Sequence, residues 1–475
     1  MTPHLPAEIH AIISSYLAIE DLPAYRLSNK HLADIGAQHL FRDLSFHASH
    51  ASLTRLKNLG NHSLLNRLVH RITWDTSSIS LDTWDFNDWE SRIRTLRRHE
   101  LAELRESWHA QLIDSEFVEE CMQRFLWKQY ERYTKLVTEE REILDDHPAD
   151  VTSLFASFPK LKTIVVERKV HDGPDGWPGP LETQATGLVQ RGILQRHRKV
   201  SYRYSSDMFP LVAALRVAHS SVHQLEVRTL NFAVFGQGIY GEHLQHIDVW
   251  GITRLYLQFS LTDPGSETLE SSMNIINCKR VLHRGHLKDF LRKFTSLQAL
   301  GLDFEARSLG NGRAPVDLQD IFGEDQAWPQ LRALTICHAD TPASTITALL
   351  SSHAASLRSL SLGDVCLDPP GSWESLLSDI QPSLSLTNAE FYYFLFDARI
   401  GGFARGRSAM LGWYVDSQES VEMGMSDLGK RLEVFMIRGG ICPLWEQQKV
   451  ARVVGRLEDR RMDDWIRGSN SSVVT

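Results

Sequence analysis

Histidines in pairs are the first residues in this sequence that could do chemistry, because two imidazoles a few residues apart can share a metal ion. The sequence contains three such pairs: His219 with His223, His243 with His246, and His283 with His286. No cysteine or carboxylate completes a usual ligand set at metal spacing, and HELAE at 99–103 lacks the second histidine of a zinc-protease motif. We therefore expect surface or core histidines and no bound metal.

A glycine-rich stretch, FGQGIYGEH, matches the G-x-G-x-x-G pattern of dinucleotide sites at Gly236, Gly238 and Gly241. Such a site needs a helix to begin at the turn, because the helix N-terminus holds the pyrophosphate. The next strand-like segment begins at Leu244 and leaves no room for that helix. We expect a loop here and no cofactor. No G-x-S-x-G, P-loop or kinase signature occurs elsewhere.

A basic stretch, RGILQRHRKVSYRY at 191–204, interleaves two tyrosines with its charges. Such a stretch could contact RNA or another phosphate-rich partner. It follows a Gly/Pro-rich loop in a chain whose formal net charge is −8. That balance argues against a general nucleic-acid binder and favours a solvated loop.

The composition is that of an ordinary globular protein, with 475 residues of which 42% are hydrophobic and 23% charged. This length suffices for two to four domains or one long repeat array. The five cysteines are scattered and never form a C-x-x-C pair, which is typical of a reducing compartment and predicts a cytoplasmic or nuclear location. The sequence contains no run of about 18 apolar residues, so it predicts no membrane span.

The middle of the chain, residues 150–387, repeats a short pattern with apolar residues at its first, fourth and sixth positions. The last three positions alternate as a half-buried strand does, and helical stripes precede several copies. One helix and one strand cannot bury their own apolar faces, so we expect the units to stack into a solenoid with a parallel, curved sheet. The seven copies are LKTIVV at 161, VHQLEV at 222, LQHIDV at 244, ITRLYL at 252, LQALGL at 297, LRALTI at 331 and LRSLSL at 357.

The spacing of the copies is irregular. Those at 244 and 252 begin too close together for a helix between them, so one is a chance match or a hairpin partner. A doubly wound sheet would also alternate helices and strands, but its strands are usually longer and continuously apolar. Polar alternates such as Glu226, Asp248 and Ser359 favour a sheet with one face in water. The predicted fold class is α/β.

The outward positions of the strands would form a curved binding face in such a solenoid. Among them, Arg228, Trp250, Arg254 and Tyr256 have the side-chain types most enriched at binding hot spots. They are our candidate substrate-binding residues. The alternative, that they are ordinary strand-face residues covered by loops, stays open.

The N-terminal residues 5–42 predict three short helices. Asp21 and Ser28 are placed to cap the second and third of these helices. A unit of this size is near the lower limit for folding alone, so its surplus apolar surface must be covered by the rest of the chain or by another protein. The apolar stripe of the first helix consists of Ile9, Ile12, Ile13, Tyr16 and Leu17.

The remaining segments complete a division of the chain into parts. A helical linker or insert covers 47–149, with two long, charge-laced helices within 88–147. The C-terminal part carries strand-like FYYFLF and LEVFMIR, then an amphipathic helix near 445–465 and a disordered tail. We expect it to cap the open end of the array. The four predicted parts are 1–46, 47–149, 150–387 and 388–475.

Residues 5 to about 46 combine a Leu-Pro start, an isoleucine-rich helical stripe, a second start at Asp21-Leu22 and a closing LFR at 40–42. In this combination the segment resembles an F-box domain, most closely those of filamentous-fungal F-box proteins. The strand repeats resemble degenerate leucine-rich repeats, a frequent partner of the F-box. Two departures are Asn29 before Lys30 and the absence of a tryptophan near the third helix, where His39 stands.

The resemblance implies that the three-helix unit docks on a Skp-type adaptor, which links it to a cullin–RING ubiquitin ligase of the SCF type. It implies a non-enzymatic substrate-recognition subunit without a cofactor or a membrane partner, whose repeat body binds an unknown protein substrate. Two alternatives are an interaction scaffold that uses the F-box without ubiquitin transfer, and an α/β enzyme of unknown chemistry. The adaptor-binding residues implied by the match are Leu5, Pro6, Ile9, Ile13, Leu17, Asp21, Leu22 and Leu27.

Overall fold

The computed structural model divides the chain into two compact units. The first comprises residues 1–161 with 166–213, and the second comprises 162–165 with 214–475. The residues that the structure describes are 5–18, 21–76, 85–96, 98–111, 115–143, 153–167, 211–212, 215–216, 222–236, 244–247, 249, 251–260, 278, 280–304, 316–323, 328–368, 370–403, 407–415, 428–446 and 450–454.

The first unit begins with the three expected helices, α1 (Ala7–Tyr16), α2 (Leu22–Leu27) and α3 (Lys30–Leu40). Pro6 stands directly before α1, and α2 carries a proline in its first turn. A proline at these places removes no intrahelical hydrogen bond, because the first N–H groups of a helix have no partner within it. Both α1 and α2 pack against α3.

The caps of these helices differ from the sequence prediction. The side chain of Asn29, and not that of Ser28, caps α3: its Oδ1 accepts a 2.9 Å hydrogen bond from Leu32 N–H. Asp21 precedes α2 as predicted, but its side chain makes no capping hydrogen bond. Both candidates at 28 and 29 have suitable side chains, so only the backbone conformation decides which one caps.

A strand–helix–strand repeat follows directly on the three helices. It consists of β1 (Asp43–His47), α4 (His50–Asn61), the short 3₁₀ helix η1 (Leu65–Arg67) and β2 (Arg71–Asp75). The two strands pair in parallel, with Asp43 opposite Arg71. The predicted division at residue 47 is therefore wrong, since residues up to 75 belong to a strand–helix repeat and not to a helical linker.

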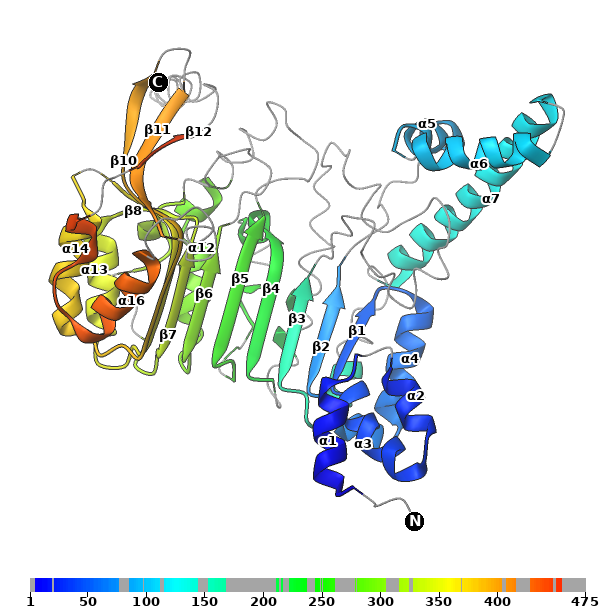
Figure 1. The fold of residues 1–475 in the computed structure, drawn as a ribbon, viewed down its shortest axis with the longest axis horizontal. Coiled ribbons are helices and arrows are strands. Elements are labelled where there is room, and N and C mark those ends of the chain that lie inside the picture. The colour runs from blue at the N-terminus through cyan, green and yellow to red at the C-terminus, as the bar shows by residue number, and fades with distance from the viewer. Residues whose placement is uncertain are drawn as a thin grey trace. The chain divides into compact units, whose positions relative to one another are not determined.

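The insert that follows forms three helices where two were predicted: α5 (Phe86–Leu96), α6 (Arg98–Gln111) and α7 (Ser115–Arg141). Both α5 and α6 pack against α7 (Figure 1). The three helices share a core of their own in which Trp89 and Tyr133 are fully buried. The apolar face of each charged helix is thus covered by the neighbouring helices of the insert.

Strand β3 (Thr163–Glu167) is divided between the two units, because residues up to Val165 count with the second and the rest with the first. In the first unit, Thr76 N–H donates a 2.8 Å hydrogen bond to the carbonyl of Glu167. In the second unit, His223 N–H donates a 2.9 Å hydrogen bond to the carbonyl of Lys162. The copy of the repeat at 161 therefore forms the predicted strand.

The second unit is built on a sheet of parallel strands, which confirms the predicted α/β class. Strands β4 to β7, β9 and β10 lie side by side in chain order (Figure 1). The short β8 pairs with β9. Strands β11 and β12 continue the sheet beyond β10 with antiparallel pairing. The bounds are β4 (Gln224–Asn231), β5 (Arg254–Ser260), β6 (Ala299–Asp303), β7 (Ala333–Cys337), β8 (Asp340–Pro342), β9 (Ser359–Asp368), β10 (Asn388–Phe403), β11 (Arg407–Tyr414) and β12 (Val450–Val454).

The fourth position of each repeat forms one continuous layer of the core. Its residues lie opposite one another across neighbouring strands, and none is more than 2% exposed. The layer consists of Leu225, Leu255, Leu300, Leu334 and Leu360. The copy at 244 forms no strand in its described residues, whereas the copy at 252 is β5. The copy at 244 is therefore the chance match.

Helices connect the strands of the second unit, but not evenly. Helix α12 (His286–Arg292) precedes β6, α13 (Ala343–Ser352) precedes β9 and α14 (Trp373–Ile380) precedes β10. Between β6 and β7 the described residues hold only the three-residue 3₁₀ helix η6 (Leu318–Asp320). Two further 3₁₀ helices, η4 (Phe232–Phe235) and η7 (Gln381–Ser383), follow β4 and α14.

The C-terminal part differs most from its prediction. FYYFLF lies in β10 as expected, but LEVFMIR is the end of helix α16 (Leu428–Arg438) and not a strand. The predicted helix near 445–465 is also wrong where the structure describes it, since η8 (Pro443–Glu446) is followed by β12. Residues 455–475 lie outside the described part. No helix of the described part is long and apolar enough to cross a membrane.

Candidate functional site

Helix α1 turns its apolar stripe away from the helices that it packs against. Ile12 is 54% exposed and Tyr16 86%, while the only buried residue of α1 is Ser14. A surface helix of a globular protein normally buries its apolar stripe and exposes its polar face. We define the docking face as the exposed stripe residues of α1 together with Leu5, which precedes the helix: Leu5, Ile9, Ile12, Ile13 and Tyr16.

Polar contacts hold α1 in this orientation. The Tyr25 hydroxyl of α2 lies 2.9 Å from Nδ1 of His10 and 3.3 Å from the His10 carbonyl oxygen. Ser14 Oγ donates a 3.0 Å hydrogen bond to the carbonyl of Ala11, so the buried hydroxyl is satisfied within α1 itself. Helix α1 therefore contacts its neighbour through polar groups, and its isoleucines remain exposed.

The structure separates the eight residues carried over from the F-box resemblance. Leu22 is only 4% exposed and is a core residue of the three-helix unit, so its assignment to adaptor binding is wrong. Leu17 is half-buried. Leu22 is the first residue of α2 and is buried, which the Asp-Leu start could not indicate. The remaining six are exposed and available to a partner: Leu5, Pro6, Ile9, Ile13, Asp21 and Leu27.

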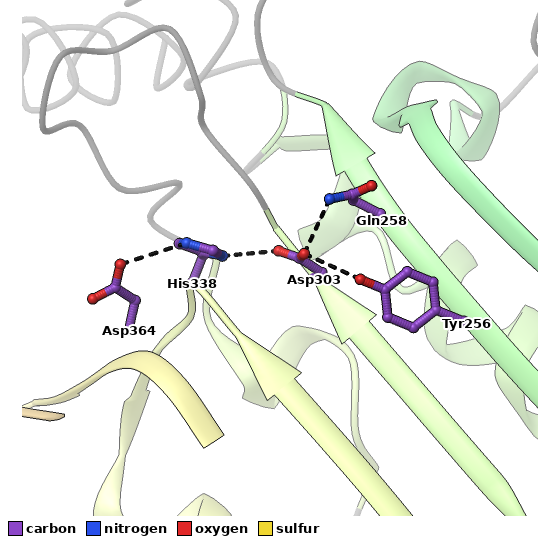
Figure 2. A network of polar contacts seen from close by, with 5 residues as sticks. All are labelled: Tyr256, Gln258, Asp303, His338 and Asp364. Carbon is purple, nitrogen blue, oxygen red and sulfur yellow. Dashed lines mark hydrogen bonds and ion pairs between the residues drawn. The ribbon is translucent and has the colours of Figure 1, made fainter. Parts of the chain in front are cut away.

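A polar network on the strand face of the second unit is the second candidate (Figure 2). Its centre is Asp303 at the end of β6, a carboxylate that is only 8% exposed. One carboxylate oxygen accepts hydrogen bonds of 3.2 Å from the Tyr256 hydroxyl and from the Gln258 amide. The other lies 2.8 Å from Nδ1 of His338, whose Nε2 lies 3.5 Å from a carboxylate oxygen of Asp364. We call these five residues the strand-face network.

Close packing over a glycine allows Tyr256 to reach Asp303. Tyr256 and Gly301 are partners on β5 and β6, and a Cβ at Gly301 would lie 2.4 Å from the Tyr256 ring. The ring therefore crosses Gly301 to the next strand. Tyr392 crosses Gly363 in the same way from β10. Burial raises the pKa of both tyrosine hydroxyls, and for Tyr256 the nearby Asp303 charge raises it further.

The network also contains unusual backbone. Among the described residues, His338 (φ 57°) and Asp364 (φ 51°) are the only non-glycine residues with positive φ. Histidine and aspartate adopt this conformation more readily than most residues, but it still costs about 1 kcal/mol or more for each. His338 N–H donates a 2.9 Å hydrogen bond to the carbonyl of Gly363, next to Asp364. The contacts between the two residues thus maintain the strained turns.

The network can bind a polar group through its hydrogen-bonding side chains. Both ring nitrogens of His338 face carboxylates, Nδ1 at 2.8 Å from Asp303 and Nε2 at 3.5 Å from Asp364. Tyr256 has a raised pKa and is a neutral donor near pH 7. Asp364 Oδ1 is buried and has no hydrogen-bond partner in the described part.

The four candidate substrate-binding residues do not meet at one place. Tyr256 belongs to the network, and Arg254 lies exposed on the same strand. Arg228 lies 3.0 Å from Glu226, with which it forms an ion pair. Trp250 lies outside the described residues. Asp303 directly follows the LQALGL copy of the repeat, whereas His338 and Asp364 have a turn-like positive φ that the repeat pattern does not define.

The histidine pairs do not form metal sites where the structure describes them. His283 Nδ1 lies 2.9 Å from Asp320, and His286 Nδ1 donates a 2.8 Å hydrogen bond to the carbonyl of Phe235. The described residues contain no group of three histidine, cysteine or carboxylate side chains that could hold a metal ion. His219, His243 and the stretch 191–204 lie outside the described part.

Comparison with models of known protein families found no match, and comparison with curated proteins found no relative.

Proposed function

We propose that the chain is an F-box-type substrate-recognition subunit of a cullin–RING ubiquitin ligase, with the docking face bound to a Skp-type adaptor. One observation carries this proposal: α1 is held to α2 through His10 and exposes its isoleucines. The resemblance of residues 5–46 to an F-box supplies the identity of the partner. An apolar stripe of this kind on a soluble unit favours a protein interface.

The energetics agree with an interface that needs well-fitted anchors. The five side chains of the docking face are on average about half exposed, so covering them gives about 5 kcal/mol, at about 1 kcal/mol each. Association costs about 4–15 kcal/mol in lost motion and ordering. Because this gain lies at the lower end of the cost, a few central residues must supply most of the net affinity. Ile9 and Ile13, one helical turn apart, are the proposed anchors.

We propose that the substrate binds the strand face of the second unit. The exposed Arg254 lies on β5, the strand that also carries Tyr256 and Gln258 of the network. An interaction scaffold that binds the adaptor but transfers no ubiquitin remains the alternative. Capture of adaptor together with a cullin would favour the ligase, and capture of adaptor alone would favour the scaffold.

The test is direct binding of the purified full chain to a purified Skp-type adaptor. The double substitution Ile9→Asp/Ile13→Asp places two charges in the docking face and should reduce adaptor capture by at least about a hundredfold. Leu64→Ala is the matched control, because Leu64 is also exposed (69%) but lies outside the three helices. Undiminished capture by the double variant would refute adaptor docking through α1. Leu22 is unsuitable for this test because its truncation would disturb the fold.

A further inference from the structure

A cavity of about 610 Å³ opens between α12 and α13 in the second unit. The connection between β6 and β7 also contributes to its lining, through Gln319 of η6 and through Phe322 and Gly323. The remaining lining residues come from the two neighbouring helices. Its volume is in the range of small-molecule sites.

Two cationic side chains meet at one wall of this cavity. A Cβ at Gly323 would lie 2.9 Å from a guanidinium nitrogen of Arg292 and 3.0 Å from the ammonium of Lys288. Both charges thus approach the same point, and they are no more than about 6 Å apart. Like charges at this separation repel each other. Gly323 makes the approach possible, since any side chain there would displace both groups.

Little in the described part compensates these charges. The ion pair of Arg292 with Asp289 is 3.7 Å long and exposed, and no carboxylate of the described residues forms an ion pair with Lys288. On the α13 side the lining includes the neutral polar residues Ser344 and Thr345 of the first turn, and η6 contributes Gln319. The positive end of the α13 dipole adds to the field on that side.

We infer that this cavity binds a phosphate-bearing small molecule, with the phosphate between Lys288 and Arg292 on one side and the hydroxyls on the other. Arginine and lysine together supply a fork and a point charge for phosphate oxygens. Phe322 and Leu349 form an apolar part of the lining, which suits an organic moiety attached to the phosphate. This inference does not depend on the proposed adaptor docking.

The experiment is isothermal titration of the full chain with three probes, namely inorganic pyrophosphate, ATP and adenosine. Pyrophosphate and ATP should bind, with affinities that fall as salt is added, and adenosine should not bind measurably. The variant Lys288→Gln/Arg292→Gln should weaken binding of both anions by about tenfold or more. Gly323→Ala should also weaken it, because the added methyl group displaces both cations.

Arg332→Gln is the control, since Arg332 is exposed and does not line the cavity. It should bind the anions as the unchanged chain does, and thermal unfolding without ligand should be similar for all variants. Failure of the full chain to bind either anion would overturn the inference. Equal binding by the double variant, or binding of adenosine as tight as that of ATP, would also overturn it.

Discussion

Tyr256 connects two strands because its ring crosses Gly301 and its hydroxyl reaches Asp303 on β6. The Asp303 carboxylate also accepts a hydrogen bond from Gln258 and contacts Nδ1 of His338. One buried carboxylate therefore connects side chains from three strands or their ends. A buried carboxylate without donors would be costly, and each donor offsets part of that cost. The network is therefore both a proposed binding surface and a stabilising element.

Removal of the Tyr256 hydroxyl tests this stabilisation. Tyr256→Phe keeps the ring over Gly301 but deletes one donor to Asp303, and it should lower the free energy of unfolding by about 1 kcal/mol. Tyr16→Phe is the control, because Tyr16 is 86% exposed and its hydroxyl faces water. The control should change stability by less than about 0.5 kcal/mol. Denaturant unfolding of the full chain measures both, and equal effects would contradict the role given to the network.

The raised pKa values of Tyr256 and Tyr392 predict a dependence of stability on alkaline pH. The folded chain holds these two protons more tightly than the unfolded chain, whose tyrosines ionise near the ordinary value of 10.0. Stability should therefore fall as the pH rises above about 10. The double variant Tyr256→Phe/Tyr392→Phe should show a shallower fall. Urea unfolding between about pH 8 and about pH 11 measures how steeply the free energy of unfolding falls with pH. Equal slopes for the unchanged chain and the double variant would show that these tyrosines do not cause the fall.

At the scale of the element, α16 shows how a periodic pattern can be misread. In LEVFMIR the alternating residues 432, 434 and 436 fit a strand, whereas 432, 435 and 436 fit one face of a helix. The structure buries Leu432, Phe435 and Met436, and it leaves Val434 43% exposed. With a short segment both periods fit, and only the packing of the finished fold decides between them.

Truncation of single side chains separates the helix from the strand. Phe435→Ala should destabilise the chain by about 3–5 kcal/mol, because it empties a buried site. Val434→Ala should cost less than about 1 kcal/mol, since that side chain already faces water. A strand would require the opposite order. Thermal or denaturant unfolding of the two variants measures the difference.

The cap of α3 offers a second test at this scale. Asn29→Ala should lower stability by about 1 kcal/mol, because Leu32 N–H loses its acceptor. Ser28→Ala should have little effect, although the sequence alone favours Ser28 as the cap. Helical circular dichroism and denaturant unfolding of both variants distinguish the two positions. A larger effect of Ser28→Ala would show that the helix begins one residue earlier.

The repeat pattern predicted β4, β5, β6, β7 and β9 because its fourth position is a core position in each of these strands. Leu255 and Leu334 illustrate this, since both are buried and both stand fourth in their copies. The pattern did not predict β1 and β2, whose segments DLSFH and RITWD carry an aromatic core residue in place of the leucine series. Phe46 and Trp74 pack against each other at 4.9 Å between ring centroids, a contact that no spacing rule indicates.

The candidate site was predictable only where function follows from local sequence. The exposed stripe of α1 is a local feature, so its residues were found, whereas the inward turn of Leu22 depends on the packing of α2 against α3. The strand-face network joins Tyr256, Asp303 and His338 across long separations in sequence. Such contacts depend on strand order and register, which a single sequence leaves open.

At the scale of the whole molecule, the two compact units separate two kinds of surface. The first carries the apolar docking face, and the second carries the polar strand-face network and the cavity beside α12. An apolar face suits a partner that stays bound, whereas a polar face suits selection among partners. This separation matches a protein that holds one constant partner and recognises another.

Adaptor binding should accordingly stabilise the first unit and leave the strand face of the second almost unchanged. A partner present at about a hundred times its dissociation constant stabilises the bound state by about 2.7 kcal/mol. Hydrogen–deuterium exchange of the full chain with and without the Skp-type adaptor measures where this protection appears. We expect slower exchange in α1, α2 and α3 and no change in β5, β6 and β7. Protection confined to the strands would place the adaptor on the strand face and would reverse the roles proposed for the two units.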